Sequence, residues 1–106
     1  MYKIEFLPIA KRDIDDIIYY ISHNLKNITA SKKLRDLFMS SLDNIIEFPY
    51  GCSVYQSVGT LKYEYRSYRV KNFLMFYIVD EKKKLITIVR VLYQKMNINN
   101  ILEWFD

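Results

Sequence analysis

The sequence predicts an α+β fold in which a helical hairpin packs on one face of a four-stranded, mainly antiparallel sheet, followed by a short C-terminal helix or tail. The stretch from Tyr63 to Asn97 is rich in strand-forming residues. It breaks only at Lys71-Asn72 and at Asp80 to Lys84, each short enough to close a hairpin. Two apolar stripes at helical spacing come before it, and an alternating segment opens the chain.

The opening segment, Tyr2 to Phe6, alternates apolar and charged residues and predicts a short strand. Pro8 follows where a helix can begin, because its fixed φ suits the first turn and its missing N–H costs nothing there. Apolar residues then recur at the spacing of a helix that is buried along one stripe. They are Ile14, Ile17, Ile18, Ile21 and Leu25.

A second helix is predicted by a similar series, with polar N-cap candidates between Asn27 and Ser31. The stripe consists of Leu34, Leu37, Phe38, Ser41, Leu42 and Ile45. Phe48-Pro49-Tyr50-Gly51 should end this helix. Two such helices joined by a short polar link form an antiparallel hairpin, and their stripes must cover one face of a sheet.

The second half of the chain should supply the rest of that sheet. Phe73 to Val79 is apolar at nearly every position, so both faces of this strand should be covered, whereas Lys62 to Val70 mixes charged and aromatic residues and should be wetter. Residues 50–60, with Gly51 and Gly59, read as a loop. The apolar residues from Asn97 to Phe105 indicate a short helix or tail that needs a surface to pack on.

Length and composition indicate one domain spanning residues 1–106, large enough to bury a core without a metal or a disulfide. No apolar run approaches the roughly 20 residues of a membrane span, and the first residues lack the apolar core of a signal peptide. We therefore expect a cytoplasmic protein with no membrane partner. Positive charge is concentrated in the second half, where nine Lys and Arg face five Asp and Glu, and this favours an acidic partner.

Ordinary catalytic motifs are absent from the sequence, and no metal site or cofactor is predicted. The single cysteine, Cys52, is interpreted as structural, and His23 as a residue near a helix end where a positive charge is favourable. Asp13, Asp15 and Asp16 fit the outward face of the first helix better than a metal site.

The remaining chemistry is basic and aromatic. Arginine and lysine can neutralise phosphates and stabilise the charge of a transition state, and tyrosine rings can stack on bases. A metal-independent ribonuclease could be built from such residues, but each of them could equally serve a structural role, Arg90 for example in an ion pair at the edge of the core. The set is Lys62, Tyr63, Tyr65, Arg66, Tyr68, Arg69, Lys71, Arg90, Tyr93 and Lys95.

Over nearly its full length the chain resembles the RelE/ParE superfamily, the toxins of type II toxin–antitoxin modules. YKIEFLPIAKRDIDDIIYYI, residues 2–21, is similar to the opening strand and helix of that family, and Pro49 and Gly51 fit its helix-ending element. The strongest similarity lies in the second half. It comprises Tyr65-Arg66, Asn72-Phe73, Phe76-Tyr77, Asp80 and the run from Ile88 to Tyr93.

The resemblance implies one of two activities. RelE-like members cleave mRNA on the ribosome with basic residues on the sheet, whereas ParE-like members inhibit DNA gyrase and lack that set. Leu74 stands where the RelE-like pattern has an arginine, and Gln94-Lys95-Met96 keeps only one residue of a later basic pair. The ParE-like branch is therefore favoured, and a catalytically inactive member that only binds an antitoxin stays open.

The resemblance, together with the basic, aromatic and apolar residues themselves, gives the candidate site residues. Contacts with the target, gyrase or the ribosome and its mRNA, are expected from Arg66, Arg69, Arg90 and Lys95. A RelE-like active site would draw on Lys62, Arg66, Arg69, Tyr93 and Lys95. An acidic, partly disordered antitoxin is the expected partner, bound through Tyr65, Tyr68, Trp104 and Phe105.

Overall fold

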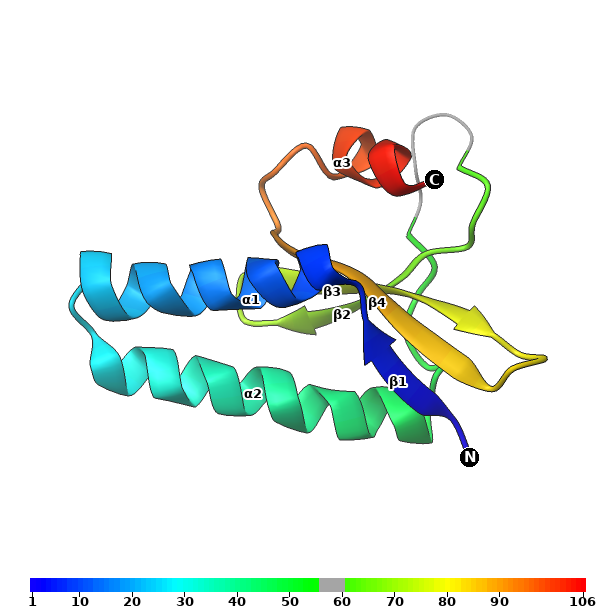
Figure 1. Cartoon of the computed structure of the whole chain (residues 1–106), viewed down its shortest axis with the longest axis horizontal. Helices are drawn as coiled ribbons and strands as arrows, with labels where there is room; N and C mark the ends of the chain where they lie inside the picture. The colour runs from blue at the N-terminus through cyan, green and yellow to red at the C-terminus, as the bar shows by residue number, and fades with distance from the viewer. Residues whose placement is uncertain (56–60) are drawn as a thin grey trace.

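The computed structural model describes residues 1–55 and 61–106, so Gly59 of the expected loop lies outside the described residues. Within these ranges the chain runs as a strand, a helical hairpin, a three-strand meander and a last helix (Figure 1). The elements are β1 (Lys3–Phe6), α1 (Pro8–Tyr19), the π-helical turn η1 (Tyr20–Asn24), α2 (Ile28–Glu47), β2 (Arg66–Val70), β3 (Phe73–Asp80), β4 (Leu85–Tyr93) and α3 (Ile98–Phe105). The predicted α+β architecture is confirmed.

The four strands form one sheet in the order β1-β4-β3-β2. Strands β2, β3 and β4 pair antiparallel, and β1 pairs parallel with β4, starting with Lys3 opposite Leu85. The sheet is therefore mixed but mainly antiparallel, as expected. Its two edges are β1 and β2.

Local signals in the sequence explain the bounds of the hairpin. Pro8 occupies the first turn of α1, and the side chain of Asn27 caps α2 by accepting a hydrogen bond from the N–H of Ala30 at 3.0 Å. Between the helices Lys26 adopts a left-handed φ of 52°, which reverses the chain. Helix α2 ends at Glu47, directly before the predicted stop signal.

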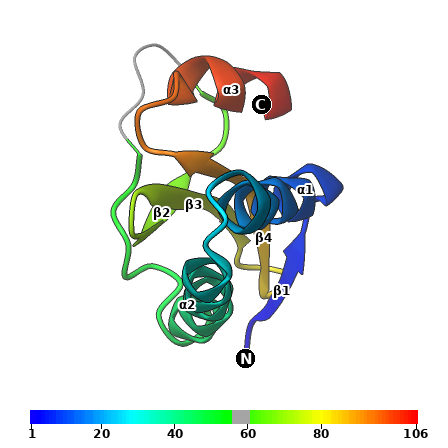
Figure 2. The same ribbon diagram turned by 90° about the vertical axis from the view of Figure 1, so that its left-hand side faces the viewer.

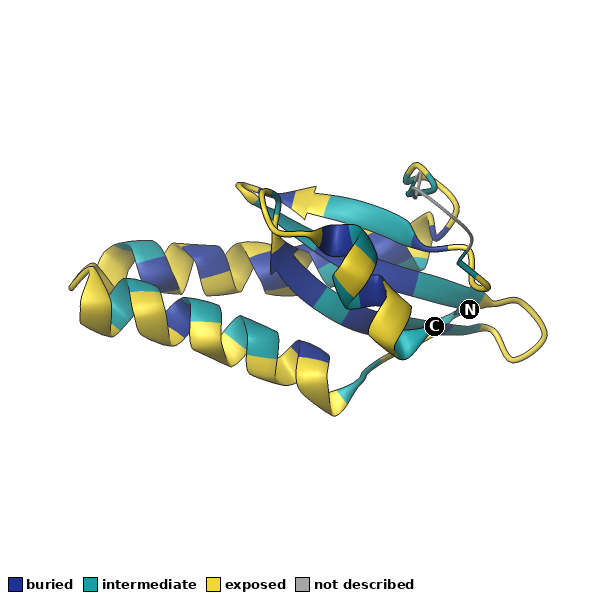
Figure 3. Ribbon diagram, turned by 90° about the horizontal axis from the view of Figure 1, so that it is seen from above, coloured by how far each residue is buried: buried dark blue, intermediate teal, exposed yellow. Residues whose placement is uncertain are grey.

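Helices lie on both faces of the sheet (Figures 2 and 3), and buried apolar side chains form a core on each side. Helices α1 and α2 cover one face, where Phe38 packs with Met75. Helix α3 covers part of the other face, the outer face, where Leu102 packs with Phe76. Met75 and Phe76 are adjacent in β3 and both fully buried, which confirms that this strand is enclosed on both sides.

A β-bulge interrupts the pairing of β3 with β4. Phe76 lies opposite Arg90 whereas Tyr77 lies opposite Ile88, so Val89 is an extra residue in β4. The bulge lies where β1 stops pairing, since the N–H of Leu7 donates the last bond of that ladder to Ile88 at 3.0 Å. Within residues 1–55 and 61–106, β4 has no strand neighbour on the β1 side beyond this point.

Strand β2 begins at Arg66 and not at Lys62, so the predicted start of this strand is wrong by four residues. The backbone N–H groups of Lys62 and Tyr63 donate to the side chain of Asp106, at the end of the chain, and not to a neighbouring strand.

Among the described residues no helix is long and apolar enough to cross a membrane.

Candidate functional site

The predicted basic and aromatic residues do not form one surface on the sheet. Lys62 and Arg66 lie at the beginning of β2, whereas Arg69, Tyr93 and Lys95 lie at the opposite end of the sheet. The middle of the outer face is apolar and partly covered by α3. Apart from Arg90, which lies opposite Phe76, the cations of the predicted set are thus divided between the two ends of the sheet.

Arg66 anchors the chain that follows α2. Its Nη1 atom donates to the carbonyl of Cys52 at 2.6 Å and to that of Tyr50 at 3.3 Å, and its Nη2 atom pairs with Glu64 at 2.9 Å. The guanidinium also lies over the Tyr50 ring, 5.0 Å from its centre. The side chain is only 15% exposed, so most of its donors are already used inside the fold.

Arg90 forms a bidentate ion pair with Asp13 of α1. Its Nε and Nη2 atoms donate to the two carboxylate oxygens at 2.8 and 2.9 Å, and the N–H of Val91 donates to the same carboxylate at 2.9 Å. The hydrogen bonds to Asp13 raise the pKa of Arg90. Asp13 therefore extends the hydrogen-bonding edge of β4 past the end of β1, and Arg90 has the structural role that the sequence left open.

Arg69, Lys71 and Lys95 remain exposed at the other end of the sheet. The N–H of Gln94 donates to the carbonyl of Asn72 at 2.9 Å, which brings the β2–β3 turn beside the end of β4. The end of the sheet near the β2–β3 turn therefore carries three cations in proximity.

Tyr93 lies at the same end but on the other face from Arg69. Its ring packs on Phe73, with 6.0 Å between ring centres, on the side of the helical hairpin. Arg69 lies opposite Leu74 in the β2–β3 pairing, so the two residues belong to the same face of the sheet, and Leu74 contacts the core under α3. Three of the five residues proposed for RNA cleavage thus share one end of the sheet without converging on a single face.

The four residues expected to bind an antitoxin differ in their exposure. Tyr65 is 1% exposed and donates its hydroxyl to Asp106, so its ring is part of the core and offers no free surface. The hydroxyl of Tyr68 accepts a hydrogen bond from Asn44 of α2, and Phe105 packs against Tyr65. All three therefore have contacts within the fold, Tyr65 and Phe105 with each other and Tyr68 with α2.

Trp104 is the exception, because it is 92% exposed on the outward side of α3. An exposed tryptophan presents a large apolar area with one hydrogen-bond donor, the combination that protein interfaces favour.

Asp106 ties α3 to the segment before β2. Its carboxylate accepts from the N–H groups of Lys62 and Tyr63 and from the Tyr65 hydroxyl. Desolvation would raise the pKa of Asp106, but these hydrogen bonds, the backbone ones first, outweigh it and lower the pKa.

Glu81 joins three parts of the chain at the β3–β4 hairpin. It accepts hydrogen bonds from the hydroxyls of Tyr2 at 2.6 Å and Tyr50 at 2.7 Å, and from the Lys84 amine. The bonds from Lys84, Tyr2 and Tyr50 lower the pKa of Glu81 to about 2. The bond to Glu81 in turn raises the pKa of Tyr50 to about 12.

A groove between α2 and β2 was not predicted from the sequence. Two adjoining hollows of about 300 and 290 Å³ share Leu37 and Lys71 as lining residues. Together they form the α2–β2 groove. Its apolar lining includes Ile21, Leu34, Leu37, Tyr68, Val70 and Phe73, and its basic lining consists of Lys33, Arg69 and Lys71.

The sequence placed Leu37 in the apolar stripe of the second helix, which should be buried. In the structure Leu37 is 39% exposed and lines the groove. Among the described residues no three metal-binding side chains gather closely enough to hold an ion. His23 stacks on Tyr19 near the end of η1, and Cys52 is half-buried.

A family model described as the ParE toxin of the type II toxin–antitoxin system parDE matches residues 4–98. The chain belongs to the ParE toxin family. The sequence resemblance to the RelE/ParE superfamily is thereby confirmed, and the chain is the toxin of a type II toxin–antitoxin system. No curated protein matches the toxin in sequence.

Solved structures share the fold of the toxin. A chain of the chromosomal ParDE system from P. aeruginosa superposes with a TM-score of 0.69 at 17% identity, covering 88% of the toxin and 96% of that chain. A chain of the RelBE2 toxin–antitoxin complex from Mycobacterium tuberculosis gives 0.57 at 15% identity, with 87% and 96% covered. The isolated E. coli RelE toxin gives 0.58 at 11% identity, with both chains covered fully.

Replacement of Asp13 should destabilise the toxin. Asp13→Ala leaves the Arg90 guanidinium and the Val91 N–H without their acceptor in a partly buried place, and we expect a loss of about 2–3 kcal/mol in the free energy of unfolding. Asp16→Ala, an exposed change on the same helix, should alter it by less than about 0.5 kcal/mol. Urea denaturation measures both, and equal effects of the two variants would contradict the structural role of the ion pair.

The contribution of Glu81 should depend on pH in a defined direction. Its folded pKa of about 2 lies below the ordinary 4.5, so its interactions stabilise the fold fully above about pH 4.5 and are lost as the pH falls toward 2. The difference in unfolding free energy between the natural toxin and Glu81→Gln should therefore shrink over that range. Denaturation midpoints at several pH values test this, with Glu5→Gln as the control for loss of one exposed carboxylate. A difference independent of pH would refute it.

Proposed function

We propose that this toxin arrests growth by binding DNA gyrase and that it is not a ribonuclease. The observation that carries the proposal is the engagement of Arg66 and Arg90 inside the fold, at separate places. Cleavage of RNA without a metal needs several cations that converge on one phosphate. The exposed cations at the β2–β3 turn are instead suited to binding an acidic surface, with Arg69 and Lys95 as the contact residues.

The alternative is a ribosome-dependent mRNA endoribonuclease of the RelE type. The presence of Tyr93, Arg69 and Lys95 at one end of the sheet favours it, because a tyrosine can transfer protons and the cations can bind phosphates. Convergence would require Arg69, which lines the α2–β2 groove, and Lys95 to turn toward the Tyr93 ring.

Expression of the toxin alone in bacteria should distinguish the two activities. We expect growth arrest with relaxed plasmid DNA and intact mRNA, and inhibition of purified gyrase by purified toxin. The double variant Arg69→Ala, Lys95→Ala should lose at least about tenfold in inhibition, since two exposed charge contacts are removed, whereas Lys11→Ala should inhibit normally. Cleaved mRNA with normally supercoiled plasmids would instead establish the ribonuclease.

We also propose that an acidic antitoxin neutralises the toxin and that it docks in the α2–β2 groove. The apolar lining fits the buried face of an amphipathic segment, and the cations Lys33, Arg69 and Lys71 fit carboxylates along its edges. The M. tuberculosis relative was solved as a toxin–antitoxin complex, which supports a partner of this kind. Trp104 offers a second anchor on α3.

Charge reversal at the rim of the groove should weaken this complex. Lys33→Glu should lower the association rate of the antitoxin about tenfold and reduce its dependence on salt, because a charge that steers the encounter is inverted. Lys32→Glu changes the adjacent residue, which does not line the groove, and serves as the matched control. Surface plasmon resonance at two salt concentrations measures both. Equal rates for the two variants would exclude this site for the antitoxin.

A further inference from the structure

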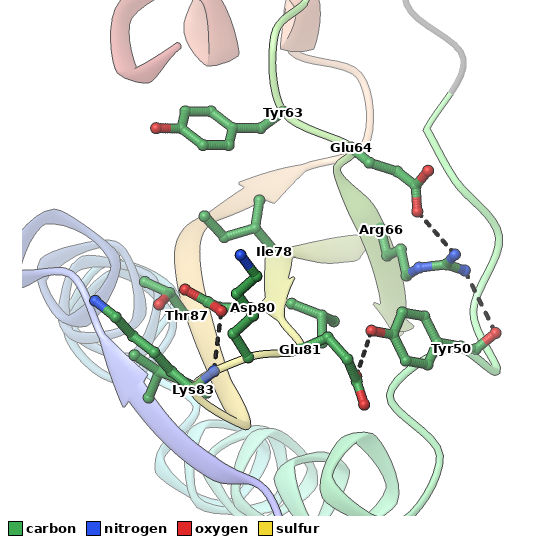
Figure 4. A pocket seen from close by; sticks show the side chains of 12 residues that line it. Tyr50, Tyr63, Glu64, Arg66, Ile78, Asp80, Glu81, Lys83 and Thr87 are labelled. Carbon is green, nitrogen blue, oxygen red and sulfur yellow. Dashed lines mark hydrogen bonds and ion pairs between the residues drawn. The ribbon is translucent and has the colours of Figure 1, made fainter.

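Strand β3 is longer than its neighbour β2, and the extra length is unpaired on one side. The pair Arg66–Tyr77 is the last one between β2 and β3, whereas β3 continues to Asp80 and pairs with β4 throughout. The chain before β2 turns away, held by Asp106. A cleft of about 520 Å³ lies beside this open edge (Figure 4).

The register indicates which backbone groups face the cleft. Val70 and Phe73 close the two-residue β2–β3 turn, so they form a hydrogen-bonded pair, and in an antiparallel ladder every second pair is of that kind. Arg66 and Tyr77 are such a pair, and two residues further Val79 must turn its N–H and C=O toward the cleft. Among the described residues no backbone group bonds to Val79 from that side.

The side chains around the edge indicate what could pair there. Ile78 and Thr87 lie on the outer face and line the cleft, where Ile78 is only half-buried at the margin of the core under α3. Lys82 and Lys83 line the same cleft, and within the described parts of the chain neither has an ion-pair partner.

The two carboxylates of the hairpin are already engaged. Glu81 is bound by the Lys84 amine and two tyrosine hydroxyls, and Asp80 accepts the N–H of Lys83 at 3.1 Å. The two lysine amines are therefore available to carboxylates from outside.

We infer that the edge of β3 from Ile78 to Asp80 takes an extended, acidic segment of the antitoxin as an added strand. Its backbone pairs with Val79, an apolar side chain covers Ile78, and a carboxylate reaches Lys82 or Lys83. This inference rests on the proposed neutralisation by an acidic antitoxin. It adds a backbone contact to the side-chain contacts of the α2–β2 groove.

The amide of Val79 provides the direct test. With isotope-labelled toxin and the unlabelled antitoxin encoded beside it, we expect exchange of the Val79 amide hydrogen to slow at least about tenfold on binding. Nuclear Overhauser effects should connect this amide to the antitoxin. An unprotected amide in a neutralised complex would overturn the edge pairing and leave the proposed function intact. Nuclear Overhauser effects that connect Val79 only to residues 61–64 of the toxin would also overturn the edge pairing. Failure to form any complex would refute both the edge pairing and the proposed neutralisation by an antitoxin.

Two variants complete the test. Val79→Pro removes the N–H at the edge and leaves the pairing with β4, so the affinity should fall at least about tenfold while the toxin stays folded. If that variant unfolds, the double variant Lys82→Glu, Lys83→Glu takes its place as the test. Its affinity for the antitoxin should fall about tenfold. Lys11→Glu with Lys32→Glu gives the same change in net charge away from the cleft and should bind normally. Equal affinities of the two double variants would overturn the inference.

Discussion

The burial of β3 and β4 on both faces is the constraint on which the rest of the molecule depends. Met75 and Phe76 are adjacent and both fully buried, one under the helical hairpin and the other under α3. A strand enclosed in this way cannot carry exposed charge at its centre, because a charge taken out of water needs a partner. The cations are thus confined to the ends and edges of the sheet, and a basic platform across its face cannot form.

Three carboxylates accept hydrogen bonds from groups that the strands and helices leave without a partner. Asp13 continues the edge of β4 after β1 stops, Asp106 holds the segment before β2, and Glu81 joins the chain start to the β3–β4 hairpin. Each accepts three hydrogen bonds, and most of the donors lie far from the carboxylate in the sequence. In such an arrangement a carboxylate can satisfy backbone groups at places where no further strand is available.

The sequence predicted the fold well because its signals are local. Pro8 and Asn27 act within one helical turn, and the apolar run of β3 shows burial on both faces. The surroundings of the candidate site residues were harder to predict, because the partner of Arg90 lies far away in the chain. Arg90 is 77 residues from Asp13, and no local pattern separates a paired arginine from a free one.

The predicted start of β2 failed for the same reason. Lys62 to Tyr65 has the composition of a strand, but Asp106, more than 40 residues later, binds two of its amides. The α2–β2 groove also depends on where β2 lies over α2, so it could not be read from either segment alone. Tyr65, expected to contact the antitoxin, is buried in the core, and no local pattern separates a buried aromatic from an exposed one.

The positions of the groove and the open edge limit the antitoxin segment that could use both. The groove adjoins the β2–β3 turn, and the open edge lies at the far end of β3, which has eight residues. At about 3.3 Å per residue the two are roughly 20 Å apart. An extended chain covers that distance in about six residues, whereas a helix needs about 13. A short helix in the groove followed by an extended stretch would therefore reach Val79, and a helix alone could not pair with it.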